Sequence, residues 1–270
     1  MNKISSEQNL TPLQPELLKQ SSYRETFVNW NTACIKSGAI FYEFETGKDA
    51  QLIRLIPDAC PDFSFQITDH DVNAIVFGIQ QDAIEVSLAP HSRYFGFKPF
   101  SCNGSFLQQS SWQELFGKRV SFNDLFKNHS EVLFLLQNAK SYEERIEVIQ
   151  SFAKENMVNH NYYPGLAEHI EETICTLKGN IQIEDITEQT NYSSRYCREK
   201  FTEANGISIK KYAEIMRNQN VVRMLLGNPD SSLLDIAYEN NYFDQAHMTH
   251  AFSKYAGASP VKFRNMYSCI

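Results

Sequence analysis

The sequence predicts an α+β protein. A β-rich, sandwich-like or barrel-like N-terminal domain precedes a helical linker and an all-helical C-terminal domain with two helix-turn-helix motifs. Three observations predict this architecture. Short runs rich in Phe, Ile, Val and Tyr alternate with Asp, Gly, Pro and Asn from residue 26 to about residue 100. Beyond Phe100 the segments take helical spacing, with Ser before them and Gly or Asn after them. Two of the C-terminal helical segments also repeat one another.

We divide the chain at these changes of pattern. The predicted segments are a flexible N-terminal arm over 1–25, a β-rich domain over 26–128, a helical linker or dimerisation region over 129–164, and a helical domain over 165–270. The 270 residues are 42% hydrophobic and 21% charged, which is enough for two ordinary cores and argues against wholesale disorder.

The composition also excludes several classes. No apolar run approaches the ~20 residues of a membrane helix, and the N-terminus lacks the apolar region of a signal peptide. We therefore expect a soluble cytoplasmic protein with no membrane partner. The six cysteines are scattered without a C-x-x-C pair, which predicts reduced thiols rather than a disulfide framework or zinc knuckle. Cys60, flanked by Asp58 and Asp62, leaves a redox or metal trigger open.

Six strands are expected in the β-rich domain, and "DHDVN" marks a turn between two of them. The strand sequences are "AIFYEFET", "AQLIRLIPD", "DFSFQIT", "NAIVFGIQ", "AIEVSLAP" and "RYFGFKPF". Their aromatic side chains either line a ligand pocket or fill a core, and the sequence leaves both readings open. These aromatic residues are Phe41, Phe44, Phe63, Phe65, Tyr94, Phe95 and Phe97.

Short helices follow the strands. "SSWQELFGKRV" has a Ser N-cap and a stop at Gly117, and "SFNDLFKN" begins a second helix. "SEVLFLLQNAKSYEERIEVIQSFAKENM" predicts two more, with Ser141 and Glu144 as a capping box for the second. That second helix, over 141–155, has an apolar face suited to packing or to a dimer seam. The face comprises Ile146, Ile149, Phe152 and Ala153.

Seven helices are expected from residue 165 onward, and two pairs of them form a repeat of about 50 residues. Each unit has a short helix, a tight turn, a second helix, a Gly and a capping Ser. A long helix over 208–226 joins the units. The matching pairs are Ile186 and Ile236, Tyr192 and Tyr242, Phe201 and Phe252, Gly206 and Gly257, Ser208 and Ser259, and Tyr212 and Phe263.

The stretch "DIAYENNYFDQAHMTHAFSKYAGASPVKFR" resembles the signature of the AraC/XylS family of bacterial transcription regulators, and the resemblance covers residues 165–267. "LIPDACPDFSF", "YFGFKPF" and "WQELFGKRVSFNDLF" are similar to the β-rich N-terminal domain of one subgroup. The resemblance implies a DNA-binding domain over 165–270 and a regulatory or sensor domain over 26–128. It further implies double-stranded promoter DNA and RNA polymerase as partners, activation as the commoner mode, and an N-terminal domain for effector sensing or homodimerisation.

The sequence departs from the family in two ways. Asn191 and Asn241 stand where the turns usually carry Gly, and Asn tolerates the same positive φ. Residues 165–270 hold 11 Lys and Arg against 13 Asp and Glu, a net charge of about −2, within a chain of net charge −7. An acidic balance weakens non-specific affinity for DNA, so specific contacts must contribute more.

Outward positions on the two second helices are the predicted DNA contacts. Arg pairs with guanine, Glu accepts from cytosine, Gln reads adenine, and Ala or Thr methyl groups contact the thymine methyl. The predicted inward residues are Cys197 and Phe201 in the first unit, and Phe243, Met248 and Phe252 in the second, with Asp244 as an N-cap. The predicted DNA contacts are Ser194, Arg195, Arg198, Glu199, Lys210, Lys211, Gln245, Ala246, His247, Thr249 and His250.

The alternative is an enzyme or metal protein that uses His247 and His250. With Asp244 they form D-x-x-H-x-x-H, but three donors on one straight helical face do not converge readily on one ion. The sequence contains no P-loop, G-x-S-x-G or G-x-G-x-x-G motif. We therefore predict neither catalysis nor a cofactor or metal.

Overall fold

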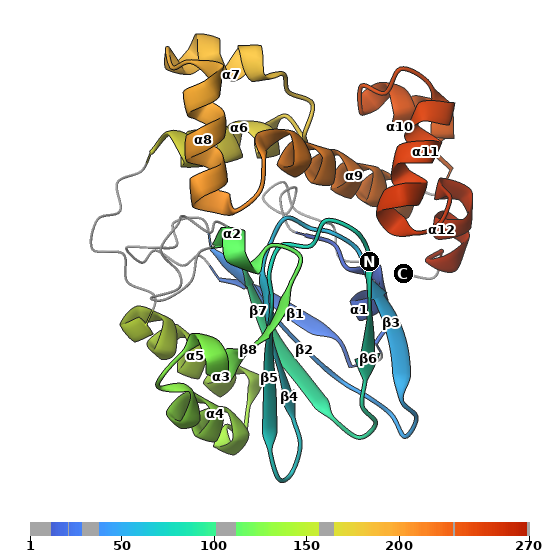
Figure 1. Ribbon diagram of the computed structural model, residues 1–270. Coiled ribbons are helices and arrows are strands. Elements are labelled where there is room, and N and C mark those ends of the chain that lie inside the picture. Colours follow the sequence, from blue (N-terminus) through green and yellow to red (C-terminus); the bar gives the residue numbers. More distant parts are fainter. Residues whose placement is uncertain are drawn as a thin grey trace.

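A computed structural model describes residues 12–20, 22–28, 38–100, 112–156, 165–228 and 230–268. Its β-rich part holds a six-stranded antiparallel sheet in the order β1-β2-β7-β4-β5-β8 and a two-stranded sheet, β3-β6 (Figure 1). The strands are β1 (Arg24–Val28), β2 (Ala39–Glu45), β3 (Gln51–Leu55), β4 (Asp62–Ile67), β5 (Val72–Phe77), β6 (Ile84–Leu88), β7 (Arg93–Pro99) and β8 (Arg119–Ser121).

The aromatic residues of β2, β4 and β7 fill cores. Phe63 and Phe97 face each other across β4 and β7, with ring centroids 4.4 Å apart. Phe41, Phe65 and Phe95 are fully buried in the same cluster, so on this face of the sheet the aromatic side chains fill a core. Phe44 and Tyr94 belong to a smaller cluster between the two sheets, with ring centroids 5.2 Å apart, and both also line a recess there.

Helices α3 (Phe122–Leu125), α4 (His129–Asn138) and α5 (Tyr142–Asn156) cover the sheet. The short α2 (Trp112–Leu115) contacts α8 (Ser194–Asn205) of the C-terminal half. Gly117 has a φ of 70°, as the predicted stop requires. Ser141 accepts from the Glu144 amide at 3.1 Å, as predicted. A capping box would pair the Glu144 carboxylate with the amide of Ser141. The carboxylate instead accepts from the amide of Lys140, one residue earlier, at 2.7 Å. Ile149 and Phe152 pack into the sheet core, so this face of α5 is used for packing.

All seven predicted C-terminal helices are present. They are α6 (Leu166–Thr176), α7 (Ile183–Thr190), α8 (Ser194–Asn205), α9 (Ile209–Gly227), α10 (Leu233–Glu239), α11 (Gln245–Ala256) and α12 (Pro260–Met266). In Figure 1 they lie above the strands, and α9 connects the α7–α8 pair to the α10–α11 pair. The α+β fold class is therefore confirmed.

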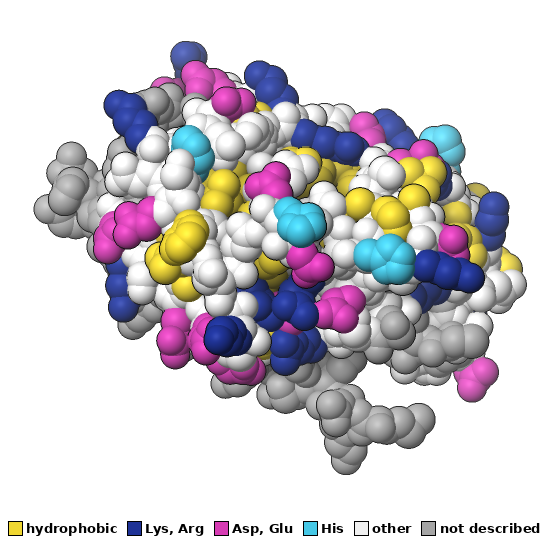
Figure 2. Space-filling model, turned by 90° about the horizontal axis from the view of Figure 1, so that it is seen from below, with side chains coloured by type: hydrophobic (Ala, Val, Ile, Leu, Met, Phe, Trp, Pro, Cys, Tyr) yellow, Lys and Arg dark blue, Asp and Glu magenta, His cyan; other side chains and the backbone are white. Residues whose placement is uncertain are grey.

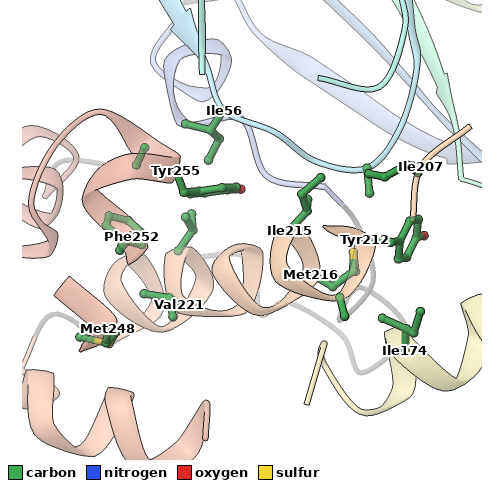
Figure 3. Packing of buried hydrophobic residues seen from close by; sticks show 14 of the residues in the cluster. Ile56, Ile174, Ile207, Tyr212, Ile215, Met216, Val221, Met248, Phe252 and Tyr255 are labelled. Carbon is green, nitrogen blue, oxygen red and sulfur yellow. The ribbon is translucent and has the colours of Figure 1, made fainter. Parts of the chain in front are cut away.

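The two halves share one hydrophobic cluster. Ile56, Ala59 and Ile79 from the β-rich half are buried together with side chains from α6 to α12. Figure 3 shows Ile56 beside Tyr255, above the helix that carries Ile215 and Val221. The Tyr255 hydroxyl donates a hydrogen bond to the Pro57 carbonyl, so the β-rich half is held directly against α11.

The prediction of a loose arm over 1–25 is wrong for the part that the structure describes. Helix α1 (Pro15–Leu18) places Leu17 at 3% exposure between the sheets. The Leu13 amide donates to Gln219 in α9 at 2.9 Å, and the Tyr267 hydroxyl donates to Glu16 at 2.5 Å. The apolar spacing of Leu13 and Leu17 was a signal for a packed segment.

Charges of both signs are interspersed on the face seen from the side of the β-hairpins (Figure 2). Within the described residues, no helix combines the length and the apolar character that crossing a membrane requires. Cys60 is 8% exposed, and its amide donates to Asp58 at 3.2 Å. This burial limits access of an oxidant to the thiol. Cys34, Cys102 and Cys269 lie outside the described residues.

Candidate nucleic-acid interface

The first unit has the backbone of a helix-turn-helix. Helix α7 ends at Asn191, which adopts the left-handed conformation with φ 58°. Ser193 then caps α8, and its hydroxyl accepts from the Tyr196 amide at 3.3 Å. Cys197 and Phe201 are fully buried, as predicted, so they fix α8 against the rest of the unit. This orientation leaves the opposite face of α8 free for contacts outside the protein.

The second unit repeats this construction. Asn241 has a φ of 52°, which confirms that Asn supplies the turn in place of Gly. Asp244 caps α11, and its carboxylate accepts from the His247 amide at 2.7 Å. Met248 and Phe252 are fully buried. The N-cap and two of the three inward residues predicted for this unit are confirmed.

The equivalence of the units extends to their aromatic packing. The rings of Phe201 and Tyr212 meet edge-on at 5.4 Å, and those of Phe252 and Phe263 meet edge-on at 5.1 Å. Gly206, at the end of α8, has a φ of 71°, as does the glycine at the end of α11. The next helix after each glycine has a serine N-cap. The sequence repeat is thus a structural repeat.

The predicted contact residues lie at the surface in two groups, one on each second helix, with the lysines near the start of α9. The side-chain nitrogen of Lys211 lies 3.6 Å from the carboxylate of Glu214 on the same helix. The exposed residues are Arg195, Arg198, Glu199, Lys210, Gln245, Ala246, His247 and His250, and the half-buried residues are Ser194, Lys211 and Thr249.

The two second helices differ in the charge at their N-termini. Helix α8 begins with a neutral Ser193 cap and has no acidic residue in its first turn. Helix α11 begins with the carboxylate of Asp244. Because a helix N-terminus attracts anions, the start of α8 favours a phosphate, whereas Asp244 already occupies that role in α11. The Arg195 and Arg198 guanidinium groups on α8 add to this difference.

Asp244, the first donor of the D-x-x-H-x-x-H pattern, is used as a helix cap. His247 is exposed, with its ring edge-on to Tyr242 at 5.4 Å, so it has both a packing contact and an accessible face. His250 is exposed. Across the described part of the chain, no group of three His, Cys, Asp or Glu side chains is arranged to hold a metal ion.

The prediction that Phe243 faces inward is wrong. Phe243 is 87% exposed, because it precedes the Asp244 cap and points away from the unit, where Tyr242 is buried instead. Sequence reasoning also missed an exposed aromatic pair that joins the turn before α8 to the first turn of that helix. Tyr192 and Tyr196 are 50% and 42% exposed, with ring centroids 5.0 Å apart.

The geometry of residues 183–266 defines a tandem helix-turn-helix domain. Residues 186–266 match the family described as "Helix-turn-helix domain". This match identifies residues 186–266 as a helix-turn-helix domain.

Two curated operon regulatory proteins are similar to about a third of the chain. The chain is 31% identical over 86 residues to the melibiose operon regulatory protein of Escherichia coli K12, a match covering 32% of this chain and 28% of that protein. It is 32% identical over 85 residues to the Msm operon regulatory protein of Streptococcus mutans, covering 32% and 30% respectively. The chain therefore spans less than a third of either relative.

Solved structures of ToxT from Vibrio cholerae align over most of the chain. ToxT from Vibrio cholerae O395 covers 93% of this chain and 100% of its own, at 12% identity and a TM-score of 0.44.

Proposed function

We propose that this protein is a sequence-specific, DNA-binding transcription regulator that reads the major groove with α8 and α11. One observation carries the proposal: two structurally equivalent helix-turn-helix units each bury one face of the second helix and expose a polar face. A single helix of this kind is an ambiguous feature. Two such helices joined by one long helix suit successive segments of the major groove.

The contact residues divide into two roles under this proposal. Arg195, Arg198 and Glu199 on α8 contact base edges, as do Gln245 and His250 on α11. The remaining predicted residues are Ser194, Lys210, Lys211, Ala246, His247 and Thr249, which contact phosphates or thymine methyl groups. Exposure of Arg198 and His250 on faces opposite buried core residues supports these assignments.

The β-rich domain senses an effector, supports homodimerisation, or does both. A recess between the two sheets supports the effector role. It is lined by apolar side chains together with the polar groups of Tyr42, Asp62, Ser64, Gln66 and Asn73. The contacts of Pro57 with α9 and α11 provide a physical route from this domain to the DNA-binding helices.

Activation of transcription, with RNA polymerase as the protein partner, extends the proposal, and its support is the resemblance to the AraC/XylS family. The protein acts in the cytoplasm, where its DNA partner lies. Its role is non-enzymatic, consistent with the families of operon regulatory proteins that share the domain.

Genome-wide mapping of bound DNA, with and without candidate metabolites, tests the proposal. We expect enrichment at promoters that share a sequence motif, and a metabolite that alters this enrichment identifies the effector. Fragments bound without any common motif would contradict sequence-specific regulation.

A further inference from the structure

Helices α4 and α5 form an open groove on the side of the β-rich domain. Each helix contributes one continuous stripe of residues at helical spacing, so both stripes face the groove along its whole length. The α4 side comprises Asn128, Glu131, Val132, Leu135, Asn138 and Ala139, and the α5 side comprises Glu144, Glu147, Val148, Ser151, Phe152 and Glu155.

The floor of the groove is apolar. Val132 and Phe152 are nearly buried beneath it, whereas Leu135 is 45% exposed. Phe134, the neighbour of Leu135 on α4, is 64% exposed. Adjacent positions of a helix point in different directions, so Phe134 lies outside the groove lining and Leu135 is the exposed apolar residue of its floor.

The rim of the groove is acidic. Glu131, Glu144, Glu147 and Glu155 line it, and the lining residues include no Lys, Arg or His. Two copies of this chain joined through the groove would bring both sets of carboxylates together, and like charges across an interface are unfavourable. The charge of the groove therefore favours a cationic occupant over a second copy.

The dimensions of the groove favour a helix. The α5 stripe runs from Glu144 to Glu155. At a rise of about 1.5 Å per residue it is about 16 Å long, which matches three turns of an α-helix. A helix with apolar side chains at i, i+3, i+4 and i+7 would place them on Leu135 and Val148, and its flanking lysines and arginines would meet the glutamates.

We propose that the α4/α5 groove is a docking site for a basic amphipathic helix, about three turns long, of a partner protein. The site is separate from α8 and α11, so the proposal does not depend on DNA binding.

A binding experiment with the full-length protein tests the proposal. The probe is a fluorescent 14-residue peptide of Lys and Leu, arranged with one apolar face, and the comparison is a peptide of the same composition in permuted order. We expect the amphipathic peptide to bind at least about tenfold more tightly by fluorescence anisotropy, because only it presents apolar anchors on one side.

Substitutions locate the site. Leu135→Lys and Glu147→Lys each reduce affinity for the amphipathic peptide by about fivefold or more. The matched controls are Leu234→Lys, at a leucine that is 47% exposed on α10, and Glu188→Lys, at an exposed glutamate on α7. Both controls retain wild-type affinity. Ser151→Arg, at an exposed position on the α5 stripe, provides a second groove variant.

Three results would overturn the proposal. The first is equal binding of the two peptides, and the second is equal loss in the groove and control variants. The third is a wild-type dimer in sedimentation velocity that Leu135→Lys dissociates, which would assign the groove to a second copy. Promoter DNA binding is unchanged in the groove variants, so failure here is distinguishable from failure of the proposed function.

Discussion

The side-chain amide of Gln219 in α9 donates a 2.9 Å hydrogen bond to the Pro57 carbonyl in the β-rich half. The same side chain is 1% exposed and also bonds Leu13 and the Tyr255 hydroxyl. One buried amide thereby joins the N-terminal segment, the loop after β3, the long helix and α11. The relative placement of the two halves depends on this contact as well as on apolar packing.

Gln219→Ala should lower the free energy of unfolding by about 2–3 kcal/mol, because several buried partners lose their hydrogen bonds at once. Urea unfolding followed by circular dichroism measures the change, with Gln189→Ala at an exposed position of α7 as the control. A loss no larger than that of the control would show that Gln219 does not hold the halves together.

Lys98→Met should destabilise the protein by about 3–5 kcal/mol at neutral pH, because it removes one partner of a buried ion pair. Lys98 lies 2.5 Å from Asp58 and 3.4 Å from Asp62, and all three are buried. Burial alone would lower the pKa of Lys98, but the two carboxylates raise it above its ordinary value. Burial also raises the pKa of Asp62.

The pH dependence of this variant has a definite sign. Without the cation, burial should hold the pKa of the Asp62 carboxyl still further above its value in the unfolded protein, because Lys98 no longer lowers it. A carboxyl whose pKa is higher in the folded than in the unfolded protein stabilises the fold at low pH. This stabilisation is lost as the pH rises through the folded-state pKa. Urea unfolding of Lys98→Met between pH 8 and pH 5 should therefore show its deficit shrinking as pH falls. A constant deficit would contradict this.

Arg198→Ala and His250→Ala should each weaken binding to a cognate promoter by about 1–3 kcal/mol without unfolding the protein, because each removes a proposed contact to bases or phosphates. Electrophoretic mobility shift or anisotropy titrations measure the loss. Lys127→Ala, at an exposed position beside α4, serves as the control for a lost positive charge. Wild-type affinity in both variants would disprove the assignment of the contact residues.

Asp244→Asn should increase affinity for DNA by about two- to fivefold at low salt, because Asn caps a helix as well as Asp does and one negative charge leaves the interface. The gain should decline as salt is added. Asp82→Asn, at an exposed turn of the β-rich domain, is the matched control. Equal affinities for Asp244→Asn and the control would place Asp244 away from the phosphates.

The sequence allowed much of this fold to be predicted, because the signals were local. The six strands β2 to β7 showed apolar runs bounded by turn residues, and the helices of the repeat showed caps at Ser193, Ser208 and Asp244. Strand β1 was missed because its residues are mostly exposed at the edge of the sheet. Strand β8 is only three residues long, too short to produce a pattern.

Contacts between distant segments could not be predicted in the same way. Gln219 is a polar residue in a helix, and the sequence gives no indication that its partner lies 162 residues earlier in the chain. Phe243 was predicted to face the core, whereas the cap at Asp244 turns it outward. The buried and exposed faces of α8 and α11 were predicted correctly where the repeat fixed them, whereas the prediction failed at Phe243, which precedes α11.

The measurement that tests the central claim most directly is protection of guanine N7 from methylation in a promoter fragment bound by the full-length protein. Two recognition helices in successive major-groove segments predict two protected patches about 10 bp apart. Arg198→Ala should remove protection from one patch and His250→Ala from the other. A single patch, or protection that neither variant changes, would contradict DNA reading by both α8 and α11.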